Sequence, residues 1–590
     1  MPFSFEASLP PWMTFTAGEV PIVLVAPHGG RRPADAPIKD SIKVNDLYTA
    51  DLTQDLAART GSYALINHSH DRNELDLNRV SQVREDAPWF LGALVELLSE
   101  LTAPHDSVRL FFIHGWNVVQ PVCDVGIGLR RRGRELVKAG KGEPTLGVSF
   151  FSDVILPFCE VAQEHDIDVA IGRRYAAAAK NNFMQVFSPR FLHDESPQIR
   201  TLAALTVQGK VNAAQLELGV GLRWPGPERD RFVEVFCHTL GSSLHNVAVS
   251  DQESDRFAQK SNRDFSIFSF PETPPEDDET PYDSLLPWTW EREPTRLALH
   301  FHDPRSGLGV MGGVEFDPAA PVHAGRLLLS LGGTEMVLFT GEDTSRRDRG
   351  QVQVGQFVWR RQPNGLSIHY QGTIMRFAHP QAFIRLEDGL AASWIEPATV
   401  ELQLLFLPFT ADRAAVIQLC QLKGSVTFPD REYPVNAWGF VDVLRPAETD
   451  RLLPRRLLSL PFGSDLGIFL ARSETPEGPR SSGIVYQNGI PYPLDPEDWQ
   501  LEYSFEHGRP TKFSIAFPSS APLSLECQGE TLTAIPIVRH AQKGDALAVT
   551  FGLSRTVWQG REAYGIYEFS EYLKDASART ERGAWQNSKD

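Results

Sequence analysis

At 590 residues the chain is too long for one hydrophobic core, so we expect roughly two to four domains. Its composition, 42% hydrophobic and 22% charged, is typical of a soluble globular protein. The formal net charge of -18 argues against a general binder of nucleic acid or of anionic membranes, because both need a basic surface.

Five cysteines lie far apart with no C-x-x-C pair, which favours reduced thiols and a cytoplasmic location. The N-terminus lacks the basic and apolar regions of a signal peptide. No stretch approaches the roughly 18 apolar residues of a membrane-spanning helix. We therefore expect no nucleic-acid partner and no membrane span.

Residues 20 to 247 alternate between short apolar runs and amphipathic stretches, which predicts an α/β sheet within a domain at 1–249. The candidate strands are Ile22–Ala26, Tyr63–Ile66, Val108–Ile113 and Ala214–Leu218. Two helical stripes repeat every four residues, one through Tyr48, Leu52 and Leu56 and one through Phe232, Phe236 and Leu240.

The proline-rich, acidic segment 250–294 is typical of a solvated linker. From Thr295 onward apolar residues alternate with polar ones, which predicts antiparallel, half-buried strands. A region of about 280 residues is large for one small barrel, so we expect β-barrels at 295–440 and 441–575. The polar tail 576–590 is expected to be disordered.

Chemically reactive side chains follow or end the strands of the first domain. His28 follows the first strand, His114 ends the third, and Glu217 lies in the fourth. Ligands of open α/β sheets bind at the carboxyl ends of the strands. Two histidines and a carboxylate make a catalytic zinc set, and a further glutamate can take a proton from water. An Asn78-Arg79 pair could hold a substrate carboxylate.

Each of these residues also has an ordinary structural interpretation. A histidine at a strand end is commonly a satisfied structural residue, and Asp46 could cap the following helix. Glu217 could face solvent on a half-buried strand, and Asp76 with Arg79 could be a surface ion pair. Their order along the chain favours a common site.

The basic run Leu129–Arg134 has two interpretations. It could be the solvated start of a helix, which we favour, or a phosphate or carboxylate site.

Residues 20 to about 245 resemble the N-formylglutamate amidohydrolase family, a branch of the zinc-carboxypeptidase-like hydrolases. The matching motifs are Pro27-His28-Gly29-Gly30, Asn45-Asp46, Leu75-Asp76-Leu77-Asn78-Arg79, Ile113-His114-Gly115 and Gln215-Leu216-Glu217-Leu218. The resemblance implies a mixed α/β sheet and one zinc ion held by His28 and His114. It also implies that Arg79, helped by Asn78, grips a substrate carboxylate and that Glu217 is the base.

Two positions depart from that pattern. The wider clan usually places a carboxylate ligand three residues after the first histidine, where this chain has Arg31. The third ligand must therefore come from elsewhere, and the resemblance offers Asp46. Family members commonly carry an aspartate two residues before the second histidine, where this chain has Phe112. A carboxylate that orients His114 is consequently not expected.

In the β region, Trp438-Gly-Phe-Val-Asp442 and the run that begins at Tyr564 resemble motifs of AttH-like, carotenoid-hydratase-like proteins. This resemblance implies paired lipocalin-like barrels with a cavity for an apolar ligand. The alternative is that aromatic side chains of the chain itself fill the barrels.

Together these features predict a multidomain zinc-dependent hydrolase. It would cleave an amide bond of a small N-acyl amino acid, or of a related carboxylate, by a metal-activated water. One alternative is a ligand-binding or scaffold protein without catalysis. Another is an isomerase or hydratase that acts on lipids or isoprenoid compounds in the β-barrels.

Overall fold

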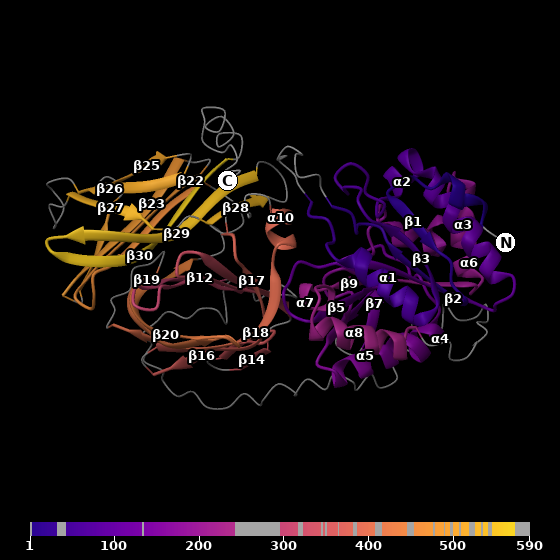
Figure 1. Cartoon of the computed structure of the whole chain (residues 1–590), viewed down its shortest axis with the longest axis horizontal. Coiled ribbons are helices and arrows are strands. Elements are labelled where there is room, and N and C mark those ends of the chain that lie inside the picture. Colours follow the sequence, from indigo (N-terminus) through magenta and orange to yellow (C-terminus); the bar gives the residue numbers. More distant parts are fainter. Residues whose placement is uncertain are drawn as a thin grey trace. The chain divides into compact units, whose positions relative to one another are not determined.

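The computed structural model describes residues 3–31, 43–132, 135–241, 295–316, 323–343, 346–348, 351–363, 365–380, 386–407, 416–444, 454–475, 478–488, 490–495, 499–506, 509–517, 526–532, 535–540 and 546–572. They form two compact units, an α/β unit within 3–241 and a β unit within 295–572 (Figure 1). No described helix is long and apolar enough to cross a membrane. The expected linker 250–294 and tail 576–590 lie outside the described residues.

The α/β unit is built on a seven-stranded mixed sheet of order β1-β3-β2-β4-β9-β5-β8. Strands β3, β2, β4 and β9 are parallel, whereas β5 runs antiparallel to β9. The bounds are β1 Met13–Thr16, β2 Val20–Ala26, β3 Ser62–Asn67, β4 Val108–Gly115, β5 Val122–Gly126, β8 Asp168–Ile171 and β9 Val211–Leu218; a separate hairpin pairs β6 Leu129–Arg132 with β7 Glu135–Lys138. The prediction of an α/β sheet is confirmed.

Helices cover both faces of this sheet, which explains why its central strands are apolar throughout. Leu24 packs in one core with α1 and α8, whereas Val23 and Val25 pack in the other with α3 and α6. The helices are α1 Thr49–Thr60, α2 Val80–Asp86, α3 Pro88–Thr102, α4 Val148–Phe150, α5 Leu156–Glu164, α6 Pro197–Val207, α7 Val220–Arg223 and α8 Pro227–His238; shorter turns are η1 Ser4–Ser8, the π-helix η2 Phe151–Ile155, η3 Phe183–Phe187 and η4 Pro189–Phe191.

The central residues of the two predicted helical stripes lie in helices, but one end residue of each stripe lies outside. Leu52 and Phe236 are buried within α1 and α8. Tyr48 precedes α1 in a left-handed conformation with φ 65°, and Leu240 follows α8. The expectation of a helix start in the basic run was wrong, because residues 129–132 form strand β6 and pair with β7.

The β unit contains a closed eight-stranded barrel and an open second sheet. The barrel order is β13-β12-β11-β10-β20-β19-β18-β17, and pairing of β13 with β17 closes it. Its strands are β10 Thr295–Asp303, β11 Leu308–Phe316, β12 His323–Leu331, β13 Glu335–Asp343, β17 Gly365–Phe377, β18 Trp394–Phe406, β19 Val416–Thr427 and β20 Glu432–Leu444; β14 Arg346–Asp348, β15 Gln351–Val354 and β16 Phe357–Gln362 extend the sheet from β17, and α10 spans Leu386–Ala391.

The second sheet corrects the expectation of two closed barrels. Its order is β24-β23-β22-β21-β30-β29-β27-β26-β25 with β28 beside β29, and no pairing among the described strands joins its two edges. It is therefore a half-barrel. Its strands are β21 Arg455–Pro461, β22 Leu466–Thr475, β23 Gly478–Gln487, β24 Ile490–Leu494, β25 Gln500–Glu506, β26 Arg509–Ala516, β27 Glu526–Thr531, β28 Ile535–His540, β29 Ala546–Trp558 and β30 Arg561–Tyr572. The expected boundary at 440/441 falls inside β20.

Aromatic rings occupy part of the buried core of the closed barrel. The rings of Phe339 and Tyr370 lie 4.5 Å apart, and those of Phe339 and Phe357 lie 5.3 Å apart. Trp359 is also fully buried. This packing favours filling by the chain's own side chains at this place, and the apolar ligand stays a prediction.

An ion-pair network at the closing seam yields a stability prediction. Arg376 of β17 donates to Glu335 of β13 at 2.6 Å and to Glu396 of β18 at 2.9 Å. We expect Arg376→Met to lower the free energy of opening at this seam by about 1–3 kcal/mol, because charged hydrogen bonds are lost in a mostly buried site. Amide hydrogen exchange of β13 and β17 measures it.

Arg555→Met is the matched control, since Arg555 also binds two glutamates but lies 39% exposed. Solvent weakens such pairs, so its effect should be clearly smaller. Equal protection of β13 and β17 in the wild type and Arg376→Met would contradict this assignment.

Candidate metal centre

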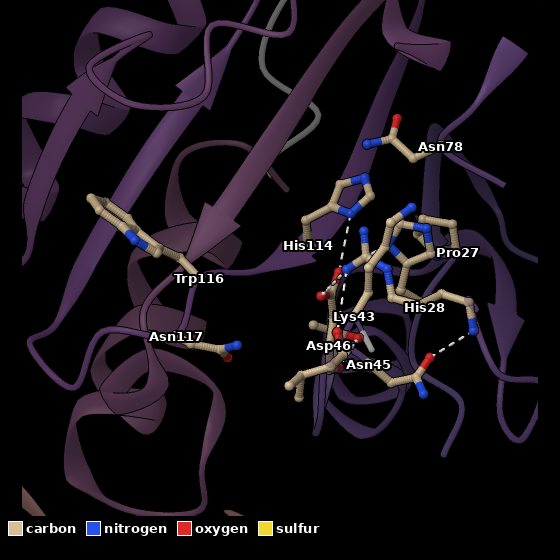
Figure 2. Close-up of polar contacts among 12 residues, drawn as sticks. Pro27, His28, Lys43, Asn45, Asp46, Asn78, His114, Trp116 and Asn117 are labelled. Atoms are coloured by element: carbon tan, nitrogen blue, oxygen red, sulfur yellow. Dashed lines mark hydrogen bonds and ion pairs between the residues drawn. The ribbon is translucent and has the colours of Figure 1, made fainter. Parts of the chain in front are cut away.

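Three ligand-type side chains converge at the carboxyl end of the central strands. Nδ1 of His28 lies 3.2 Å from Oδ2 of Asp46, and Nδ1 of His114 lies 3.1 Å from the same oxygen (Figure 2). Their ligand atoms all lie within 4.8 Å of one another. His28, Asp46 and His114 are 0%, 3% and 2% exposed, so all three side chains are buried.

Local sequence places His28 and Asp46 together. The chain leaves β2 through Pro27-His28-Gly29-Gly30 and packs tightly against the loop after β3. A Cβ on Gly30 would lie 2.2 Å from the carbonyl oxygen of His70, so glycine is required by this close approach. The backbone N–H of Asp46 donates to the carbonyl oxygen of His28 at 2.8 Å, which holds the two side chains side by side.

Strand register places Glu217 next to His114. Glu217 of β9 is the register partner of His114 in β4 and of Asp124 in β5. Paired residues share a face of the sheet, so these three side chains form a row across β4, β9 and β5. Glu217 is only 7% exposed, and the alternative in which it faces solvent is therefore wrong.

The surroundings of Glu217 suit proton transfer near neutral pH. Burial raises the pKa of Glu217 to about 7, although the nearby His114 and Arg72 act in the opposite direction. Nε2 of Gln215 donates to Oε1 of Glu217 and orients the carboxyl group. A carboxyl group of this pKa can both accept and return a proton at physiological pH.

Asp76 joins the site through His28 and was missed as a site residue by the sequence analysis. Its Oδ1 lies 2.8 Å from Nε2 of His28, and its Oδ2 lies 2.8 Å from Nζ of Lys43. Burial acts to raise the pKa of Asp76, but His28, Arg72 and Lys43 outweigh it and hold this pKa far below its usual value. The available signal was its place at the head of the Asp-Leu-Asn-Arg motif. Because it is 1% exposed, the interpretation as a surface ion pair with Arg79 is wrong for Asp76.

The imidazole of His28 lies between two carboxylates, Asp46 at Nδ1 and Asp76 at Nε2. A neutral imidazole has one N–H and can donate to only one of them. The arrangement therefore fits either a second proton or a metal cation at Nδ1. Two imidazole nitrogens and one carboxylate oxygen are a donor set that zinc accepts, with a further position open.

Asp46 is held as a carboxylate by its neighbours. Nη1 of Arg72 donates to Oδ1 of Asp46 at 3.0 Å, leaving Oδ2 to the two histidines. Burial acts to raise the pKa of Asp46, but the charge of Arg72 and the hydrogen bonds with His114 and His28 hold it well below the usual range. Asp46 is not the N-cap of α1, since that position is occupied by Tyr48.

His114 differs from His28 in its second nitrogen. Nε2 of His114 is buried and has no hydrogen-bond partner among the described residues. Within the described part of the chain, a carboxylate lies at the second nitrogen of His28 but not at that of His114.

Asn78 and Arg79 follow Asp76 beside the triad. The backbone N–H of Asn78 donates to Oδ1 of Asp76 at 3.1 Å, and Nε of Arg79 lies 3.4 Å from Oδ2. The Arg79 side chain is 45% exposed, so solvent reaches it. Oδ1 of Asn78 is buried without a partner in the described part of the chain.

These features define an α/β unit with a candidate metal centre, in a chain that also carries a β-barrel unit. No family model matches the chain, and no curated protein matches it. Among solved structures it is similar to an AttH-like protein from Nitrosomonas europaea (11% identity, TM-score 0.34, 49% of this chain and 98% of that one). It is also similar to kievitone hydratase from Nectria haematococca (9%, 0.29, 48% and 91%). An N-formylglutamate amidohydrolase from Ralstonia eutropha matches as well (12%, 0.26, 38% and 96%). These likenesses are too weak to assign a function.

Proposed function

We propose that the α/β unit is a zinc-dependent amidohydrolase. His28 and His114 would hold the ion through Nδ1 and Asp46 through Oδ2. The observation that supports this most strongly is the approach of both Nδ1 atoms to one buried carboxylate oxygen, at 3.2 and 3.1 Å. A zinc ion bound there would supply Lewis-acid chemistry and make a water molecule acidic near pH 7.

In this proposal Glu217 carries the proton. Its carboxylate would take a proton from the attacking water, and the resulting carboxyl group would return it to the leaving amine as the amide C–N bond breaks. The raised pKa of Glu217 supports both steps, since neither protonation state is strongly disfavoured at neutral pH. Gln215 would keep the carboxyl group aimed while the proton moves.

The residues beside the triad support a substrate class. The half-exposed Arg79 could bind a substrate carboxylate, because a guanidinium group pairs with a carboxylate bidentately. The unpaired Oδ1 of Asn78 could accept the substrate's amide N–H. A small N-acyl amino acid presents both groups.

A metal-removal assay tests this function. The full chain, after dialysis against a chelator and after zinc is restored, would be assayed for amine release from N-formyl and N-acetyl amino acids. We expect hydrolysis to disappear with the metal and to return with zinc. Hydrolysis that is indifferent to the chelator would contradict the proposal.

Two further measurements separate the alternatives. A folded, metal-free chain that binds N-acyl amino acids without cleaving them would favour a ligand-binding or scaffold protein. Turnover of a lipid or isoprenoid compound that is unchanged in Glu217→Gln would place the chemistry in the β unit.

Asp76 should govern the affinity for zinc without binding it. We expect Asp76→Asn to weaken zinc binding about 10–100-fold, because Asp76 fixes the tautomer and basicity of His28. Competition with a chromophoric chelator measures this affinity. Asp194→Asn is a control, since Asp194 binds Arg84 in an ion pair of the same unit. Equal zinc affinity of Asp76→Asn and the wild type would exclude the role.

A further inference from the structure

One arginine in the α/β unit is fully buried and binds mainly backbone carbonyl groups. Arg223, the last residue of α7, is 0% exposed. Its Nη1 donates to the carbonyl oxygen of Leu47 at 2.7 Å, its Nε to that of Leu218 at 2.9 Å, and its Nη2 to that of Trp116 at 3.1 Å. A further bond at 3.3 Å reaches Oδ1 of Asn117.

The three carbonyl groups belong to the three segments that carry Asp46, His114 and Glu217. Leu47 directly follows Asp46, and Leu218 directly follows Glu217. Trp116 is the second residue after His114, and Figure 2 shows both residues together with Asn117. One guanidinium group therefore connects the loop before α1 with the ends of β4 and β9.

Gly115 provides the space for this arrangement. A Cβ at this position would lie 2.4 Å from Nη1 of Arg223 and 3.0 Å from Cβ of Asp46. Any side chain at position 115 would push the guanidinium group away from its carbonyl partners. This close approach explains the glycine that follows His114.

We propose that Arg223 is a positioning residue that sets the spacing between the metal triad and Glu217. The inference rests on the proposed metal-dependent function of this site. A guanidinium group suits the task because its donors lie in a rigid planar fork and its hydrogen bonds to carbonyl groups are charge-assisted. Lysine would offer one nitrogen at one point and could not bridge three segments.

The test compares Arg223→Met and Gly115→Ala with the wild type in Co²⁺ binding. Co²⁺ replaces zinc, and its visible absorption reports the arrangement of its ligands. Arg109→Met is the matched control, since Arg109 also donates to a backbone carbonyl, that of Leu240 at 3.0 Å, near the opposite end of β4. Thermal unfolding of all variants measures any general loss of stability.

We expect Arg223→Met and Gly115→Ala to bind Co²⁺ at least about tenfold more weakly, with an altered absorption band. Arg109→Met should keep both properties even where it unfolds at a lower temperature. Gly115→Ala keeps the arginine and displaces it, so it decides the question if Arg223→Met does not fold. If Gly115→Ala is also unfolded, Arg223→Lys is scored in the same way.

Wild-type affinity and spectrum in the folded Arg223 or Gly115 variants would overturn the positioning role alone. A wild-type chain that binds no Co²⁺ would overturn the proposed metal function, and the positioning role with it.

Discussion

Glu217→Gln is expected to lower kcat for amide hydrolysis about 10²–10⁴-fold while the chain keeps its zinc, because a general base is lost and no ligand is removed. Glutamine has nearly the same shape and still occupies the place beside Gln215, so the fold should persist. Single-turnover hydrolysis of an N-acyl amino acid, together with metal analysis, measures both properties.

Glu234→Gln on α8 serves as the control, since this exposed carboxylate lies outside the triad and its neighbours. Its hydrolysis rate should match that of the wild type. Retention of most activity in Glu217→Gln would remove Glu217 from the chemistry. Loss of zinc in that variant would instead indicate that Glu217 is itself a ligand.

His114→Ala is expected to weaken zinc binding by about 10³-fold or more. Structural zinc sites gain about 10–16 kcal/mol from their full set of ligands, and this variant removes one of three protein donors. Because His114 contacts one buried carboxylate whereas His28 contacts two, the loss of stability without metal should be smaller than in His28→Ala. Metal competition and thermal unfolding measure the two effects separately.

His28→Ala should lose zinc to a similar degree but cost more stability. Its removal leaves the buried carboxylates of Asp46 and Asp76 without the group between them. His68→Ala is a control, since His68 is exposed and bonds to Thr14. Zinc affinity that is equal in the wild type, His28→Ala and His114→Ala would show that the metal binds elsewhere.

The strand before His28 was predictable, because a strand buried on both faces is a continuous apolar run in the sequence. Because ligands bind at the carboxyl ends of the strands, His28 could be assigned to the site, and the same rule assigned His114. Asp46 came from a resemblance, and its approach to both histidines depends on the loop before α1. No local pattern shows such an approach between segments far apart in the sequence.

Asp76 and Arg223 could not be assigned from the sequence for the same reason. Asp76 looked like half of a surface ion pair until the fold buried it against His28. Arg223 donates to backbone carbonyl groups of three segments. Because every residue has such a carbonyl group, the sequence does not indicate which of them an arginine binds. The burial of Glu217 depended on the central place of β9 between β4 and β5 and on the helices that cover both faces of the sheet.

In the β unit, the alternating pattern predicted strands but not closure. Whether a sheet closes depends on pairing between its edge strands, as β13 with β17 in the barrel. The hydrophobic alternation is the same in a closed barrel and in a half-barrel, since both bury one face.

X-ray absorption at the zinc edge, on the chain loaded with one equivalent of zinc, is the sharpest test of the proposed zinc site. We expect one tightly bound ion per chain with two imidazole ligands and otherwise oxygen ligands, and a spectrum that changes in His28→Ala and in His114→Ala. A well-folded chain that holds no zinc, or a spectrum unchanged in both variants, would contradict it.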